Sequence, residues 1–151
     1  MTASEPIQYR FSTFHLLSNE ELYEILAFRA EVFVVEQNCP YQDPDGQDEK
    51  AIHLQQLSGN RLVGYARLFQ GNEYHILGRV LIREKERSKG LGHALIAAAL
   101  GYITNECPPK PVKISAQLHL EKFYNTHDFK AVGESYLEDG IPHIAMIRQP
   151  D

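Results

Sequence analysis

The segment Arg87-Ser88-Lys89-Gly90-Leu91-Gly92 combines two glycines with two basic side chains, a combination suited to holding an anion. Glycines let the backbone pass close to a ligand with its N–H groups turned outward. Apolar residues follow the segment at helical spacing, so a helix is expected to begin at Gly90. The free N–H groups and partial positive charge of that helix start, with Arg87 and Lys89, predict a pyrophosphate-binding loop. The alternative is an ordinary helix start with solvated basic residues.

Two common nucleotide-binding motifs do not fit this segment. A Rossmann fingerprint needs a third glycine or alanine where this chain has Leu95, and an acidic strand end where it has the loop 108–111. A Walker A loop needs Gly-Lys-Ser/Thr, which the sequence lacks. Both nucleotide-fold interpretations are therefore disfavoured.

Hydrophobic periodicity and turn residues predict the elements that position this loop. A capping box of Ser18 and Glu21 begins the first helix. The expected helices run from Ser18 to about Phe33, from Gly90 to before Pro108, and over 120–127. The expected strands are 7–14, 52–57, 62–69, 74–82, 112–116, 129–137 and 141–147. Strands 74–82 and 112–116 are joined by a helical crossover and should be parallel, which predicts an α/β fold on a mixed sheet.

Length and composition limit the classes of protein that fit. The 151 residues suit one domain, 1–151, and a formal charge of −5 without a basic run argues against nucleic-acid binding. No apolar stretch suits a membrane span and no leader-like segment opens the chain, so a cytoplasmic location is expected. Cys39 and Cys107 are expected to be free thiols, with a disulfide as the alternative. The first five residues are expected to be frayed.

Several segments resemble the GCN5-related N-acetyltransferases, and specifically their ElaA-like branch. The loop 87–92 matches the family's Arg/Gln-x-x-Gly-x-Gly/Ala motif between a strand and a helix, and the element order is similar over nearly the whole chain. Further similar segments are Phe33-Val34-Val35-Glu36-Gln37-Asn38-Cys39-Pro40-Tyr41, Gly78-Arg79-Val80, Ser115-Ala116-Gln117 and Leu137-Glu138-Asp139-Gly140-Ile141-Pro142-His143-Ile144. The resemblance implies a mostly antiparallel sheet with a central parallel pair and helices on both faces. It also implies acetyl-CoA as co-substrate and direct transfer to an amine of unknown identity.

The resemblance also implies roles for individual residues. The pantetheine arm would bind to backbone groups of Val80, Leu81 and Ile82, whose N–H groups would polarise the thioester carbonyl. The pyrophosphate would be held by Arg87, Ser88, Lys89, Gly90, Leu91 and Gly92. Tyr124 matches the family tyrosine that protonates the departing thiolate, although helical spacing alone would place it in the core. Asp128 replaces a family glycine, and because Asp tolerates positive φ the turn is expected to survive.

The general base is open among Glu36, His75, His119 and His143. His119 is the first choice because it precedes Tyr124 in the same expected helix. A lysine amine with a pKa of about 10.4 needs more help from a base than an α-amine with a pKa of about 8. Each of these side chains could instead be structural or position the substrate.

Arg29 and Arg79 interrupt apolar patterns of the first helix and of strand 74–82. Such an arginine can snorkel at the edge of an apolar stripe, pair with a carboxylate near the site, or contact a ligand. With Glu36 and His143, these two arginines are the candidate substrate-binding residues.

Three aspartates, Asp43, Asp45 and Asp48, lie in one expected loop. In the register of a calcium-binding loop, the first and twelfth positions are Tyr41 and Ile52, where Asp and Glu are required. An acidic loop that faces the substrate and attracts a cationic acceptor is the favoured interpretation. The seven histidines show no metal-ligand spacing, so no metal is expected.

Three functional hypotheses remain. The first is an N-acetyltransferase, and the presence of Tyr124 favours it over the second, a CoA- or anion-binding sensor without turnover. The third is acyl-homoserine-lactone synthesis, because the stretch 29–33 resembles those related enzymes. The expected partners are acetyl-CoA and an amine, without nucleic acid or membrane, and a homodimer is compatible with the family.

Overall fold

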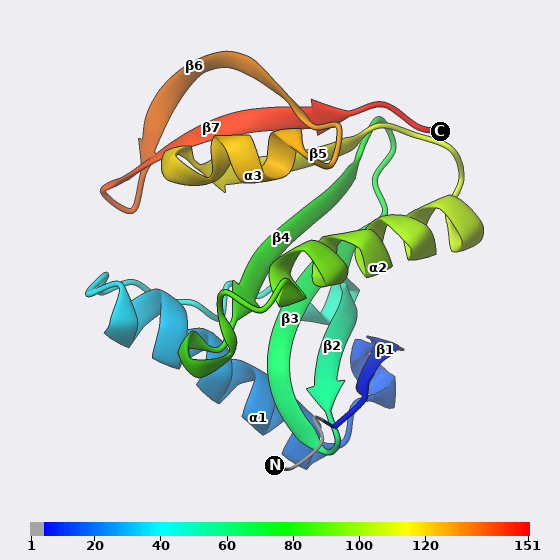
Figure 1. Cartoon of the computed structure of the whole chain (residues 1–151), viewed down its shortest axis with the longest axis vertical. Helices are drawn as coiled ribbons and strands as arrows, with labels where there is room; N and C mark the ends of the chain where they lie inside the picture. The colour runs from blue at the N-terminus through cyan, green and yellow to red at the C-terminus, as the bar shows by residue number, and fades with distance from the viewer. Residues whose placement is uncertain (1–4) are drawn as a thin grey trace.

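Within residues 5–151, which the computed structural model describes, seven strands and three α-helices follow one another along the chain (Figure 1). The strands are β1 Ile7–Thr13, β2 Ile52–Ser58, β3 Arg61–Phe69, β4 His75–Ile82, β5 Val112–Gln117, β6 Lys130–Glu138 and β7 Ile141–Arg148. The α-helices are α1 Asn19–Arg29, α2 Leu91–Glu106 and α3 Glu121–Asn125. Short 3-10 turns are Phe14–Leu16, Asp48–Lys50, Glu84–Glu86 and Leu118–Leu120. Residues 1–4 of the expected frayed end lie outside the described part.

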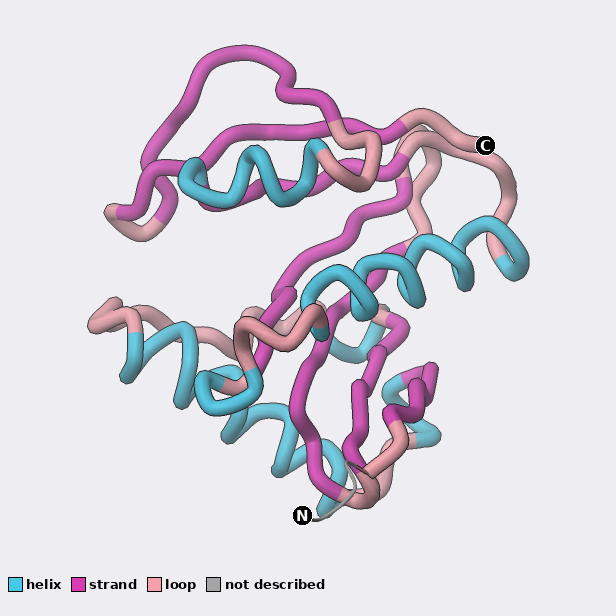
Figure 2. Tube along the Cα trace, viewed as in Figure 1, coloured by secondary structure: helices cyan, strands magenta, loops and turns pink. Residues whose placement is uncertain are grey.

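The strands of the described chain form one mixed sheet in the order β1-β2-β3-β4-β5-β7-β6. β4 and β5 are parallel and α2 lies between them in the sequence, which confirms the predicted crossover. These two strands pair only at His75↔Val112 and Ile76↔Lys113. Beyond these pairs they diverge, so that β5, β6, β7 and α3 swing away from the rest of the sheet (Figures 1 and 2).

The two faces of the sheet bear separate apolar clusters, as adjacent residues of a strand point to opposite faces. On one face, Leu95 of α2 packs in a cluster that includes Ala66 of β3. On the other, Ile25 and Phe28 of α1 pack with Tyr65, the neighbour of Ala66. Helices therefore cover both faces, as predicted. No helix within residues 5–151 is both long enough and apolar enough to span a membrane.

The first helix begins where the sequence predicts, and the helical run that it starts ends later than predicted. Ser18 Oγ accepts a hydrogen bond from the Glu21 N–H at 3.1 Å, and Glu21 Oε1 accepts one from the Ser18 N–H at 2.9 Å, which completes the capping box. After α1 the chain continues as a π-helical segment, Ala30–Glu36, rather than ending near Phe33. This last turn does not extend the buried apolar stripe, because Val35 there is 74% exposed.

Arg29 begins a buried network of opposite charges that fixes the loop before β2. The Arg–Asp network comprises Arg29, Arg67, Arg79, Asp43, Asp45 and Asp48. Arg29, at 0% exposure, donates to Asp43 at 2.8 Å and to Asp48 at 2.7 Å. These contacts explain its place on the apolar stripe. They also argue against the prediction of an acidic loop that attracts a cationic acceptor, because the three carboxylates are each held by arginines.

The network makes folding stability depend on ionised aspartates. Burial works against ionised Asp48, but hydrogen bonds and charge from Arg29 and Arg67 outweigh it and hold the pKa of Asp48 below its usual value. A hydrogen bond from Arg67 likewise lowers the pKa of Asp45. Because these folded-state pKa values lie below the unfolded ones, the stabilisation is present at neutral pH and is lost as the pH falls through them.

Replacement of Arg29 by methionine should destabilise the protein strongly, because Asp43 and Asp48 lose a buried partner. We expect the free energy of unfolding to fall by about 3–5 kcal/mol. The matched variant Arg10→Met breaks an exposed pair with Glu21, whose side chains are 54% and 26% exposed, and should cost less than about 1 kcal/mol. Urea denaturation of both variants measures the difference, and equal losses would contradict the assigned role of Arg29.

Candidate active site

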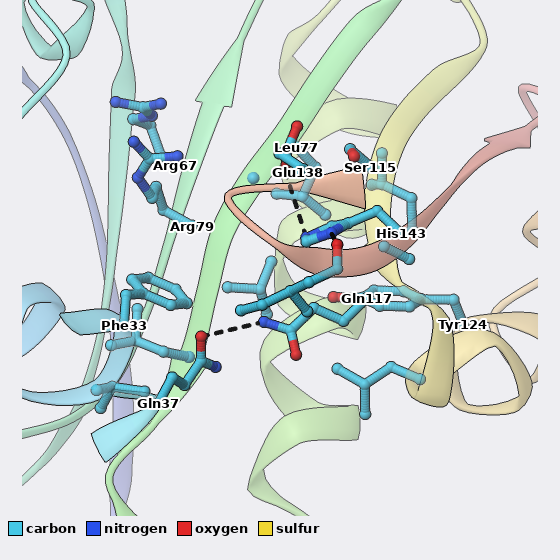
Figure 3. Close-up of a pocket in the computed structure, with 18 of the residues that line it drawn as sticks. Phe33, Gln37, Arg67, Leu77, Arg79, Ser115, Gln117, Tyr124, Glu138 and His143 are labelled. Atoms are coloured by element: carbon cyan, nitrogen blue, oxygen red, sulfur yellow. Dashed lines mark hydrogen bonds and ion pairs between the residues drawn. The ribbon is translucent and has the colours of Figure 1, made fainter. Parts of the chain in front are cut away.

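The divergence of β4 and β5 opens a cavity of about 790 Å³ in the sheet. Its walls come from the π-helical segment, β3, β4, β5, α3 and the turn between β6 and β7 (Figure 3). Gly92 and Phe123 line it on the α2 face, whereas Tyr41 and Arg67 line it on the opposite face. The cavity is therefore bordered by side chains from both faces of the sheet.

A bulge at Arg79 shapes the β4 wall. Register slips here, because Arg67 pairs with Gly78 whereas Tyr65 pairs with Leu81, which leaves one extra residue in β4. Arg79 has a φ of 47°, a conformation that typically costs about 1–3 kcal/mol. Its side chain donates to Asp43 at 2.8 Å, so the Arg–Asp network holds the bulge in place.

The β4 wall presents backbone groups to the cavity. Val80, Leu81 and Ile82 all line it, as expected. Because the β4–β5 pairing in the described chain ends at Ile76, this stretch has no β5 strand beside it. Its cavity-facing backbone groups are thus free of that ladder and can bind an extended, amide-bearing ligand.

The predicted anion loop contains two residues with left-handed backbone conformations just before α2. Ser88 has a φ of 66° and Gly90 a φ of 80°, and α2 begins at Leu91. The first N–H groups of an α-helix have no partner within the helix. At the start of α2 the N-cap residue is Gly90, so no N-cap side chain binds them either. Arg87 and Gly92 line the cavity, and Lys89 pairs with Glu86 at 3.0 Å. Ser88, Lys89, Gly90 and Leu91 are not part of the lining.

Glu36 forms an ion pair with Arg87, the arginine of that loop. Two hydrogen bonds, of 2.6 and 3.1 Å, join the Arg87 guanidinium to the Glu36 carboxylate, while Arg87 Nε donates to the Ile82 carbonyl at 3.0 Å. Glu36 lines the cavity but is engaged as a partner of Arg87. An anion that reaches Arg87 must compete with this carboxylate.

Tyr124 extends from α3 into the cavity (Figure 3). The residue is only 6% exposed, and this burial raises the pKa of Tyr124 to about 12. Its hydroxyl therefore keeps its proton at neutral pH, and it makes no hydrogen bond within residues 5–151. The turn after α3 also forms as expected, since Asp128 has a φ of 67°.

The other candidate residues divide into two groups. His119, His143 and Arg79 line the cavity together with Glu36. Arg29 does not line the cavity, because it is fully buried in the Arg–Asp network. The prediction that Arg29 contacts the substrate is therefore wrong. His75 is also fully buried outside the cavity, with Nε2 at 2.7 Å from the Pro108 carbonyl, which removes it as a base.

Several lining residues were missed by the sequence analysis. Gln117 Nε2 donates to Gln37 Oε1 at 3.3 Å across the cavity (Figure 3). Cys39 Sγ donates to the Asp139 carbonyl at 3.3 Å. Glu138 lies in the wall beside His143. All five residues belong to segments that carry the family resemblance, which was their one sequence signal. Cys39 and Cys107 are both free, as expected.

Comparison with known proteins agrees with this geometry. Residues 16–149 match the family described as "Acetyltransferase (GNAT) domain". The chain therefore belongs to the GCN5-related N-acetyltransferases. Within them it belongs to the ElaA-like branch, because protein ElaA of Escherichia coli is 44% identical over 138 residues, 88% of this chain and 90% of that protein.

Solved structures support the same assignment. The crystal structure of Escherichia coli ElaA has a TM-score of 0.90 and 40% identity, covering 95% of this chain and 100% of that one. An acyl-CoA N-acyltransferase from Pseudomonas aeruginosa has a TM-score of 0.90 and 40% identity over 95% and 99% of the two chains. The lactone synthase BjaI, at 17% identity, shares the fold alone, with a TM-score of 0.78 and coverage of 99% and 84%.

Glu36→Gln should strengthen acetyl-CoA binding, because the pyrophosphate then meets an Arg87 free of its carboxylate. We expect the Kd to fall about two- to fivefold by calorimetric titration. Glu31→Gln is the matched control: it removes the same charge from a pair with Arg83, at 2.8 Å, outside the cavity lining. Unchanged or weaker binding by Glu36→Gln, or equal gains in both variants, would contradict the competition.

Proposed function

We propose that this protein is an acetyl-CoA-dependent N-acetyltransferase that transfers the acetyl group directly to an amine. The observation that supports this most is the cavity in the split sheet, into which the Tyr124 hydroxyl extends. The anion loop borders the cavity on one face of the sheet and polar side chains border it on the other. Two substrates entering from opposite faces would therefore meet beside Tyr124.

The acyl donor is assigned to the face that bears α2. The pyrophosphate of acetyl-CoA would bind the first N–H groups of α2 and the Arg87 guanidinium. Arg87 would first separate from the Glu36 carboxylate. The pantetheine arm would extend along Val80, Leu81 and Ile82, where β4 lacks its neighbour.

Tyr124 is assigned as the general acid. Attack by the amine nitrogen on the thioester carbonyl carbon forms the new N–C bond and places negative charge on oxygen. Backbone N–H groups of β4 stabilise that charge. When the C–S bond breaks, the thiolate sulfur takes the proton of the Tyr124 hydroxyl, which is available because the phenol stays protonated at neutral pH.

The direct test is turnover of acetyl-CoA by the purified chain with a panel of primary amines, followed as release of free CoA thiol. Amine-dependent release, without release in the absence of amine, supports transfer. Tight binding of acetyl-CoA without turnover of any amine would instead indicate a sensor. S-adenosylmethionine belongs in the panel because the lactone synthase BjaI shares this fold.

Tyr124→Phe should lower kcat by about 10²–10³-fold, because the thiolate loses its proton donor. The Kd for acetyl-CoA should stay nearly unchanged, since the ring remains packed against Phe129. Tyr102→Phe is a matched control on α2, where the ring stacks on Phe11 away from the cavity. Parallel losses of affinity and turnover in Tyr124→Phe would contradict its role as the acid.

A further inference from the structure

The hairpin of β6 and β7 places a carboxylate and an imidazole together in the cavity wall. Its two-residue turn, Asp139 and Gly140, has φ values of 51° and 77°, which suit a tight hairpin. Glu138 before the turn and His143 after it both line the cavity, near Ser115 and Gln117 (Figure 3). The His143 side chain is 9% exposed, whereas that of Glu138 is 51% exposed.

The backbone fixes which ring nitrogen of His143 is bound to hydrogen. Nδ1 lies 2.7 Å from the Ile141 carbonyl oxygen, which can only accept a hydrogen bond. Nδ1 must therefore be the donor, so the neutral ring presents its lone pair at Nε2. That atom lies 3.3 Å from Glu138 Oε2, another acceptor. Two proton-accepting atoms thus converge with no hydrogen between them when the ring is neutral.

We propose that His143 and Glu138 together bind the ammonium group of the acceptor and that His143 Nε2 removes one of its protons. This proposal rests on the proposed function and identifies the acceptor class as an aliphatic primary amine that is protonated at neutral pH. Such an amine, with a pKa of about 10.4, is uncharged in only about one molecule in 2,500 at pH 7. A general base that accepts this proton beside the thioester accelerates the attack of the amine.

The protons balance through the whole reaction. The ammonium gives one proton to His143 Nε2, and the partly exposed Glu138 carboxylate passes it to solvent. The uncharged amine attacks, and its nitrogen then bears one proton in excess of the amide product. Tyr124 gives its proton to the departing thiolate, and the phenolate recovers one from that nitrogen. The net products are the amide, free CoA and one released proton.

The other candidates for the base are less suited to this task. Glu36 is held by Arg87 through two hydrogen bonds. His119 lines the cavity on the exposed turn before α3, where no hydrogen bond within residues 5–151 fixes its ring. His143 is therefore better oriented than His119, the first choice from sequence.

The charged and titratable groups around His143 come from three directions. Tyr136 of β6 stacks on its ring at a centroid distance of 6.3 Å, and Asp139 follows Glu138 in the turn. The Cys39 thiol donates a hydrogen bond to the Asp139 carbonyl of the hairpin. Arg79 lines the cavity but is bound by Asp43, so its charge is already compensated. Glu138 is thus the carboxyl side chain in contact with the imidazole.

The first test needs no acceptor. Nitrogen-15 NMR of the labelled protein, with His143→Asn to assign the signal, reports which ring nitrogen holds the hydrogen. We expect the neutral ring to be protonated at Nδ1, and propylammonium chloride to shift the Nε2 resonance. Hydrogen at Nε2 in the neutral ring would overturn the proposal. So would the absence of any shift with propylammonium.

The second test compares two acceptors, propylamine and hydroxylamine, with acetyl-CoA. Propylamine is almost wholly protonated at neutral pH, whereas hydroxylamine is largely uncharged. His143→Asn keeps an N–H near the position of Nδ1, towards the Ile141 carbonyl, but has no Nε2. We expect it to lower kcat/KM about 100-fold for propylamine and less than about threefold for hydroxylamine. Glu138→Gln should shift both values in the same directions, and the exposed His15→Asn should change neither.

The outcomes separate the two proposals. Turnover by the wild-type protein with equal losses for both acceptors in His143→Asn would overturn the role of His143 and leave the transferase intact. The same pattern in His119→Asn, with His143→Asn unaffected, would transfer the role to His119. If the wild-type protein transfers to no amine, the proposed function fails, and the NMR result alone then decides whether the pair binds ammonium.

Discussion

The ion pair between Arg79 and Asp43 ties the bulge of β4 to the loop in front of β2. A non-glycine residue at a φ of 47° is strained, and this contact compensates for the strain at Arg79. The bulge shifts the register of β4 against β3, and β4 separates from β5 beyond Ile76. The cavity, its backbone wall and the approach to Tyr124 all lie in the space that this separation leaves.

The Arg–Asp network connects the bulge of β4 to other elements of the fold. Arg29 joins the end of α1 to Asp43 and Asp48, and Arg67 joins β3 to Asp45 and Asp48. A buried charge is tolerated only when its partners are present, so the network fixes the relative positions of α1, β3 and β4. The apolar clusters on the two faces supply the larger part of the stabilisation, but they do not determine a bulge.

Local features could be predicted from the sequence, whereas pairings between distant residues could not. The strands, the crossover and the glycine-containing start of α2 follow from periodicity and turn chemistry over a few residues, whereas the turn at Asp128 was expected from the family resemblance. Tyr124 came from the family resemblance, because helical spacing alone favoured the core. Arg29 was recognised as anomalous, but its partners lie 14 and 19 residues away in a loop without periodicity. The same reason hid the pairing of Arg87 with Glu36, 51 residues apart.

The central claim is that the split between β4 and β5 binds the acyl donor with its thioester beside Tyr124. A crystal structure of the protein with acetyl-CoA tests it most directly. The account predicts the thioester sulfur within hydrogen-bond reach of the Tyr124 hydroxyl, the pantetheine along Val80 to Ile82, and Arg87 released from Glu36 to the pyrophosphate. A pantetheine arm bound elsewhere, or a sulfur remote from Tyr124 in a fully occupied complex, would contradict it.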